Sequence, residues 1–222
     1  RRAGRPPAIV RIFLLVSIGL AAGCGAAGAK SYSHPLIEQT YRLLPDGSAE
    51  VEEIRTFRFD GAFSWAFLLR KTRGAYGSYR VEYEGVWDAD TNEKLRCEMS
   101  SSGAGETVTW HYRAENTTRR FLIRYRIEGA VQRYRDVAQF YWKAIEDEHA
   151  PVDLVAITIL PPEPSPDLFK VFVHSAARPG EIEFSEDLRR ASVRQSGVSK
   201  DRFVELRVLL DPDIFPAARF ES

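Results

Sequence analysis

The stretch Arg120-Phe-Leu-Ile-Arg-Tyr-Arg-Ile-Glu128 is the clearest structural signal in this chain of 222 residues. Its alternation places Phe121, Ile123, Tyr125 and Ile127 on one face and mostly charged residues on the other. A period of two is the spacing of a β-strand, and charged residues on one face indicate that this face meets water. The stretch therefore predicts a strand in a sheet that is buried on one side.

The same alternation continues on both sides of this strand. Residues 107–113 and 203–210 each place apolar side chains at every second position. Residues 154–160 are apolar on both faces, which predicts a central strand. Weaker patterns predict further strands at 36–44, 49–59, 79–87, 94–99 and 169–174.

Turn residues separate these strands. Pro45-Asp46-Gly47 predicts a hairpin, and the proline-rich run 161–166 cannot lie inside a sheet. Residues 136–148 lack glycine and proline and fit a helix or a strand equally well. We therefore predict an all-β fold, an antiparallel β-sandwich of about ten strands with immunoglobulin-like architecture, forming one domain over residues 30–218.

Residues 1–29 predict an export signal. They contain four arginines and no acidic residue, followed by an apolar run at 12–22 and small residues up to Ala27-Gly28-Ala29. A basic start, a short apolar segment and an Ala-x-Ala exit define a secretory signal peptide. An uncleaved anchor over 12–29 is the alternative, although the strongly apolar part is shorter than a bilayer span requires.

Cys24 gives the leader a third interpretation. Leu20-Ala21-Ala22-Gly23-Cys24 resembles a bacterial lipobox, in which the cysteine thiol is acylated and becomes the new N-terminus. Ala21 stands where a larger aliphatic residue is usual. Cys24 is therefore a candidate for lipid attachment, and two acyl chains would form a stable anchor.

The charge balance excludes a nucleic-acid-binding chain. The 31 basic and 31 acidic residues cancel, and without the leader 27 basic and 31 acidic residues remain. A mildly acidic domain offers no basic surface on which nucleic acid could be held.

Several segments together resemble a known family. They are Lys30-Ser-Tyr-Ser33, Asp46-Gly-Ser-Ala-Glu-Val-Glu-Glu-Ile54, the stretch from Phe57 to Phe63, Tyr125-Arg-Ile-Glu-Gly-Ala130, Phe140-Tyr-Trp142 and Pro151-Val-Asp-Leu-Val-Ala-Ile-Thr-Ile-Leu-Pro161. In order and spacing they resemble the N-terminal extracytoplasmic domain of bacterial predicted membrane proteins called domain of unknown function 2207, over roughly residues 30–218.

The resemblance implies a secreted β-sandwich that is attached to the membrane by helices further along the chain. This sequence ends at Ser222 without such helices, so we expect either a fragment or a variant held by its N-terminus. The family carries no activity or catalytic residues that could be transferred. The expected location is extracytoplasmic and membrane-associated, in the periplasm or at the cell surface.

The sequence contains no recognisable catalytic motif. It has no nucleophile elbow, Walker loop, dinucleotide-binding glycine pattern or His-Glu-x-x-His, and its four histidines have no metal-ligand spacing. Glu146-Asp147-Glu148-His149 is the best local cluster, and it would suit a hard cation or acid–base hydrolysis. A solvated acidic loop is the simpler interpretation, so we expect no enzyme activity and no cofactor.

Aromatic residues suggest where a surface contact would form. Trp65, Tyr76 and Tyr79 lie in glycine-containing stretches and are the candidates for an exposed binding surface, whereas Trp110 and Trp142 fit the core. Three hypotheses follow. The chain is a non-enzymatic module that binds an envelope protein or glycan, a carboxylate- or metal-dependent hydrolase using Glu146–His149, or a structural spacer.

Overall fold

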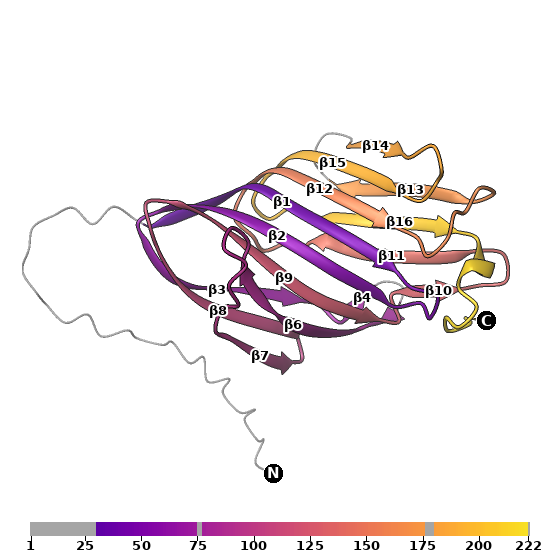
Figure 1. Cartoon of the computed structure of the whole chain (residues 1–222), viewed down its shortest axis with the longest axis horizontal. Helices are drawn as coiled ribbons and strands as arrows, with labels where there is room; N and C mark the ends of the chain where they lie inside the picture. Colours follow the sequence, from indigo (N-terminus) through magenta and orange to yellow (C-terminus); the bar gives the residue numbers. More distant parts are fainter. Residues whose placement is uncertain (1–29, 75–76, 176–179, 222) are drawn as a thin grey trace, which may run out of the picture.

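The computed structural model describes residues 30–74, 77–175 and 180–221, and the described chain is built from strands. A seven-stranded sheet has the order β14 (Glu181–Phe184), β15 (Ala191–Val198), β12 (Val152–Leu160), β1 (Ser31–Leu43), β2 (Ala49–Asp60), β9 (Thr118–Glu128) and β6 (Arg80–Asp88). It forms one layer of the molecule (Figure 1).

Two smaller sheets form the second layer. One has the order β10 (Val131–Arg133), β11 (Ala138–Ile145), β16 (Val204–Leu210) and β13 (Phe169–Ser175). The other has the order β3 (Ala62–Arg70), β8 (Gly105–Glu115) and β7 (Cys97–Ser102). The short pair β4 (Arg73–Gly74) and β5 (Gly77–Ser78) and the 3₁₀ turn η1 (Pro212–Ile214) complete the described elements.

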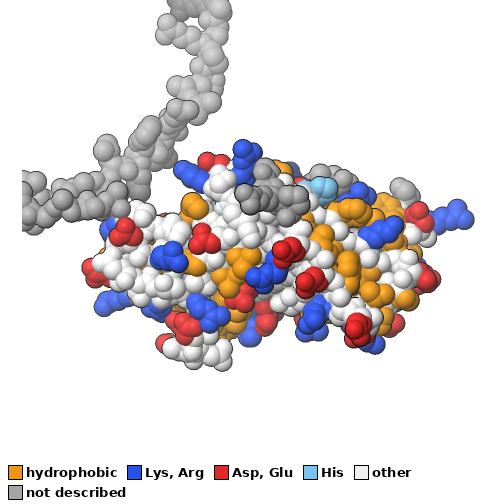
Figure 2. All heavy atoms as spheres, turned by 90° about the horizontal axis from the view of Figure 1, so that it is seen from above, with side chains coloured by type: hydrophobic (Ala, Val, Ile, Leu, Met, Phe, Trp, Pro, Cys, Tyr) orange, Lys and Arg blue, Asp and Glu red, His pale blue; other side chains and the backbone are white. Residues whose placement is uncertain are grey.

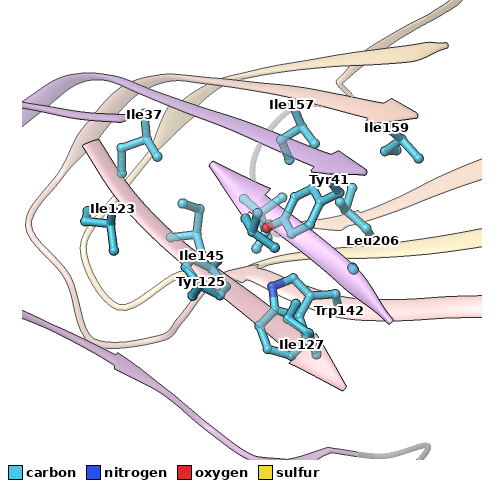
Figure 3. Packing of buried hydrophobic residues seen from close by; sticks show 14 of the residues in the cluster. Ile37, Tyr41, Ile123, Tyr125, Ile127, Trp142, Ile145, Ile157, Ile159 and Leu206 are labelled. Atoms are coloured by element: carbon cyan, nitrogen blue, oxygen red, sulfur yellow. The ribbon is translucent and has the colours of Figure 1, made fainter. Parts of the chain in front are cut away.

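Both small sheets pack on the same face of the large sheet. Tyr41 of β1 contacts Phe140 of β11 with ring centroids 5.4 Å apart, and Phe57 of β2 contacts Trp110 of β8 at 6.3 Å. Tyr41 and Phe57 both belong to the set of alternating inward positions on their neighbouring strands. The core therefore lies between one large sheet and two sheets set side by side, and Figure 3 shows part of it around Tyr41, Trp142 and Leu206.

The all-β prediction is confirmed, and so are the buried faces predicted from alternation. The four apolar positions of 120–128, the Val108–Trp110–Tyr112 face and the inward face of 203–210 are all buried. Residues 154–160 lie in β12, between β15 and β1 in the interior of the large sheet. Of the two structures open for 136–148, the strand is the one formed, as β11.

The topology differs from the prediction in two ways. First, β1 pairs with β12 in parallel, because these strands are joined through most of the chain and no hairpin constrains their direction. Second, the described chain has 16 strands, and six of them, β3, β4, β5, β10, β14 and β15, add to the about ten that the sequence predicts; of these six, β3, β14 and β15 are the longest. These three strands carry mixed patterns, and a register shift between Phe63 and Trp65 interrupts the alternation of β3.

Charges of both signs are interspersed on the surface, in agreement with the balanced composition. Figure 2 views the molecule from the side of β14 and β15 and shows lysine and arginine mixed with aspartate and glutamate. Among the described residues, no helix is long and apolar enough to span a membrane.

Candidate binding pocket

A buried ion cluster lies where the three sheets meet. Glu53 of β2 is completely buried, and its carboxylate accepts hydrogen bonds from Arg55 Nε at 2.6 Å and from Arg70 Nη2. Tyr125 OH donates to the same carboxylate at 3.1 Å. Burial alone would raise the pKa of Glu53, but the Arg55 and Arg70 guanidinium groups lower it to about 2.

Arg70 ties the cluster to the four-stranded sheet. It is the last residue of β3, and its Nη1 donates to Ala144 O of β11 at 3.0 Å. Its guanidinium also lies against the rings of Tyr125 and Trp142, at 5.6 and 5.9 Å from their centroids. One side chain therefore links β3, the large sheet and β11, and it does so with no exposed surface of its own.

Beside this cluster a cavity of about 550 Å³ opens between β3 and the large sheet. We call it the aromatic pocket. This volume is in the range typical of sites for small ligands. Rings and polar side chains both line it; the rings include Tyr32, Phe57, Phe59, Phe63 and Tyr112, and the polar residues include His34, Arg55, Lys71, Glu146, Glu148 and His149.

The rings that line the pocket pack against one another. Phe59 stacks on Phe57 at 5.3 Å and contacts Phe63 at 4.9 Å, while Tyr32 meets Phe63 edge-on at 5.9 Å. Tyr112 OH donates to Trp65 O at 3.2 Å, which fixes β8 to the neighbouring strand. Apolar rings with few convergent polar groups are the usual lining of a ligand site.

His34 is neutral at the floor of the pocket. Burial, followed by the nearby Arg55 cation, lowers the pKa of His34 to about 3. Its Nδ1 lies 3.1 Å from Thr56 O, and because a carbonyl can only accept, Nδ1 carries the proton. His34 therefore contributes an uncharged ring with an acceptor at Nε2.

The side chains of the acidic loop contact neighbouring groups. His149 places Nδ1 2.5 Å from Ala150 O and Nε2 2.6 Å from Arg202 O, so each ring nitrogen faces a carbonyl oxygen, and the nitrogen that carries the proton donates to it. Lys71 lies 3.7 Å from Glu146 and 3.3 Å from Asp147. Asp136 lies in the turn before β11, away from this loop, and no group of three or more His, Cys, Asp or Glu among the described residues could hold a metal ion.

The predicted surface aromatics have different outcomes. Trp65 is 56% exposed and stacks on Phe67 at 6.2 Å, with Phe67 equally open to solvent. Tyr79 is 8% exposed, so its assignment as an exposed aromatic is wrong: its ring packs edge-on against Trp142 at 5.5 Å, and its hydroxyl donates to Tyr141 O at 3.1 Å. Tyr76 and Cys24 lie outside the described residues.

Sequence reasoning missed Glu53, Arg55, Arg70 and His34. A signal for two of them was present, because Glu53 and Arg55 occupy inward positions between Val51 and Phe57 in a strand that alternates. A charged residue on the predicted core face needs a buried partner. Arg70 could not be paired with Glu53 from sequence, since β3 itself was not recognised.

The geometry defines a class of protein: an all-β domain with two layers, a buried ion cluster and an aromatic pocket. The chain belongs to the family described as the N-terminal domain of predicted membrane proteins, domain of unknown function 2207 (DUF2207), whose model matches residues 36–210. The predicted family is thus confirmed, and with it the assignment to a family of membrane proteins. No curated protein matches the chain by sequence.

Solved structures resemble the fold at very low sequence identity. Native yeast LTA4 hydrolase matches with a TM-score of 0.53 and 7% identity over 80% of this chain and 29% of its own. An M1 zinc metallopeptidase from Deinococcus radiodurans matches with a TM-score of 0.47 and 7% identity, over 79% of this chain and 42% of its own. The chain spans less than half the length of these proteins, and at such identity the likeness concerns the fold alone.

Proposed function

We propose that this chain is the extracytoplasmic, non-enzymatic binding module of a membrane-attached protein, and that it holds another envelope component, a protein or a glycan, in the aromatic pocket. The observation that carries the proposal is the pocket itself: about 550 Å³, lined by aromatic rings that contact one another and by the polar side chains of Arg55 and His34. A cavity in which apolar rings face a few fixed polar groups is the arrangement found at ligand sites.

The alternatives have less support. A hydrolase using the Glu146–His149 loop needs a free base, but both ring nitrogens of His149 face carbonyl oxygens and Lys71 pairs with the neighbouring carboxylates. A spacer needs only a rigid fold, and an open cavity lined by rings would lower its packing density without serving that role. The basic leader and Cys24 support the extracytoplasmic, membrane-attached part of the proposal.

Binding of N-phenyl-1-naphthylamine tests the proposal. This neutral aromatic dye fluoresces when it leaves water, so titrating it into the full chain reports an accessible apolar pocket. Ser64 lines the pocket with its side chain exposed, and Ser64→Trp should narrow the cavity and weaken dye binding by about tenfold or more.

A matched substitution gives the control. Ser101→Trp adds the same ring at an exposed position of β7 that does not line the pocket, and it should leave dye affinity unchanged. The proposal fails if the wild-type chain shows no saturable binding, or if Ser64→Trp and Ser101→Trp bind the dye equally well.

A further inference from the structure

The buried ion cluster carries one more positive charge than negative. Glu53 is the only carboxylate among the described residues that contacts Arg55 or Arg70, so one negative charge faces two guanidinium groups. Burial raises the pKa of the Tyr41, Tyr83 and Tyr125 hydroxyls, which therefore stay neutral, and His34 is neutral as well. A buried charge without a partner is costly, so the surplus points to an anion that completes the site.

Of the two guanidinium groups, Arg55 is the one that borders the aromatic pocket. Arg70 donates to Ala144 O and Lys143 O in addition to Glu53, and its Nε is buried without a hydrogen-bond partner. Arg55 donates through Nε to Glu53, and over the described part of the chain its two Nη groups have no acceptor. Arg55 is 8% exposed and borders the aromatic pocket, so these donors are placed at the pocket wall. A guanidinium end with two free Nη groups fits a carboxylate.

The free edge of β3 runs along the same pocket. In the order β3-β8-β7, β3 is hydrogen-bonded to another strand on one side only. Eight consecutive residues, Ala62 to Leu69, line the pocket, so the strand borders it along its length. An open strand edge presents backbone donors and acceptors that pair with another extended chain.

We propose that the aromatic pocket binds an extended polypeptide segment that adds to the free edge of β3, places apolar side chains among the rings and presents a carboxylate to Arg55. The edge favours a polypeptide over a lipid, because an acyl chain would leave the backbone groups of β3 without partners. At the mouth, Glu146 is neutralised by Lys71 and Glu148 is exposed, so neither opposes an anion at Arg55 strongly. The inference rests on the proposed function, because it names the ligand class of the same pocket.

Displacement of the dye from the full chain tests this ligand class. The competitors are pooled acetylated tetrapeptides with an aliphatic or aromatic residue at the second and fourth positions and a free terminal carboxylate. The matched pool carries a terminal carboxamide. We expect the carboxylate pool to displace N-phenyl-1-naphthylamine at a concentration about tenfold lower than the carboxamide pool, since the Arg55 pairing is lost in the latter.

Variants assign the difference to Arg55. Arg55→Gln should abolish the preference for carboxylate, because Glu53 and Arg70 then form a balanced pair; both pools are compared against the dye affinity of the same variant. Arg124→Gln removes a paired cation from the exposed face of the large sheet, where it does not line the pocket, and it should keep the preference. If thermal unfolding shows that Arg55→Gln does not fold, the comparison of the two pools on the wild-type chain still tests whether the pocket prefers a carboxylate.

Two further competitors distinguish a peptide from other ligands. A carboxylate pool methylated at its backbone nitrogens cannot pair with β3 and should displace the dye about tenfold less well than the unmethylated pool. Decanoate supplies the same carboxylate without a peptide backbone. The inference would be overturned if the carboxylate and carboxamide pools displaced the dye equally well. It would also be overturned if the methylated pool and decanoate were each as potent as the unmethylated carboxylate pool. Absence of dye binding would instead overturn the proposed function.

Discussion

The two halves of the second layer differ in how they fill the space above the large sheet. Where β11 and β16 cover it, aliphatic residues meet without a large cavity: Ile157, Ile159, Leu206 and Val208 are 0–1% exposed. Where β3 and β8 cover it, the contacts are between rings, and a cavity of about 550 Å³ remains open beside them. Aliphatic side chains interdigitate to crystal-like density, whereas stacked rings with an open side leave room for a ligand.

We expect the part of the core under β11 and β16 to contribute mainly to stability, and the part under β3 and β8, which we call the aromatic half, to contain the proposed binding pocket. The aliphatic half, which is the part covered by β11 and β16, buries the inward side chains of β12 and β16. The aromatic half retains apolar surface that a partner could cover, next to Arg55 and His34. The Glu53–Arg70 pair stands at the boundary, because it holds the edge of β3 against the end of β11 through Ala144 O.

Removing the Glu53 carboxylate at this boundary should have the largest effect on the free energy of unfolding. Glu53→Gln removes the only carboxylate among the described residues that faces Arg55 and Arg70 and leaves two buried cations, so the free energy of unfolding should fall by about 3–5 kcal/mol. Chemical denaturation measures this loss. Glu52→Gln is the matched control: Glu52 is the next residue of β2, exposed and paired with Arg124 at 2.9 Å, and its loss should cost about 0.5 kcal/mol or less. Equal losses in the two variants would show that the cluster does not hold the layers together.

The second largest effect is expected from one substitution in each half, compared by unfolding free energy and by dye affinity. Leu206→Ala empties a fully buried position of the aliphatic half and should cost about 3 kcal/mol in unfolding free energy without changing dye affinity. Phe63→Ala removes a partly buried ring of the pocket; it should cost roughly half as much and weaken dye binding. Denaturation and dye titration on the same samples measure both quantities. A loss of dye binding in Leu206→Ala would contradict the division.

The sequence predicted the aliphatic half better than the aromatic half, for a physical reason. Residues 154–160 and 203–210 follow a simple apolar pattern, because every inward position there is filled by an aliphatic side chain. Residues 62–70 form a strand whose inward and outward faces both carry large apolar side chains, with a register shift after Phe63, so no period of two is visible. A strand that lines an open pocket on one side escapes the rule that one face is apolar and the other polar.

The candidate site was predictable only in part. Trp65 and the Glu146–His149 loop were singled out, and both border the pocket. Tyr79 was not distinguishable from them, because the contact with Trp142 that buries it joins residues far apart in the sequence. The cluster of Glu53, Arg55 and Arg70 depends on the packing of β3 against β2, which composition and spacing do not reveal. Charged residues on an otherwise apolar strand face were the one local signal for it.

The smallest effect is the pH dependence of unfolding that His34 causes, and it tests whether water reaches this imidazole. His34 has its pKa lowered to about 3 by burial and Arg55, so between its ordinary value of 6.5 and about 3 the unfolded chain binds a proton that the folded chain does not. The free energy of unfolding therefore decreases as the pH falls through this window. From pH 6.5 to 4.5, above the range in which Glu53 takes up its proton, we expect a loss of about 2 kcal/mol.

His34→Gln keeps a donor for Thr56 O but does not titrate, so denaturation curves of this variant should be flatter over the same two pH units, while the same change at the exposed His174 should leave the wild-type slope. If the wild-type and His34→Gln slopes coincide, water reaches the imidazole, and the aromatic half is already hydrated around Arg55. A carboxylate held at Arg55 would raise the pKa of His34 and so flatten the slope of the wild-type chain. A ligand without charge would leave this slope unchanged, because the imidazole of the folded chain is already unprotonated over the window.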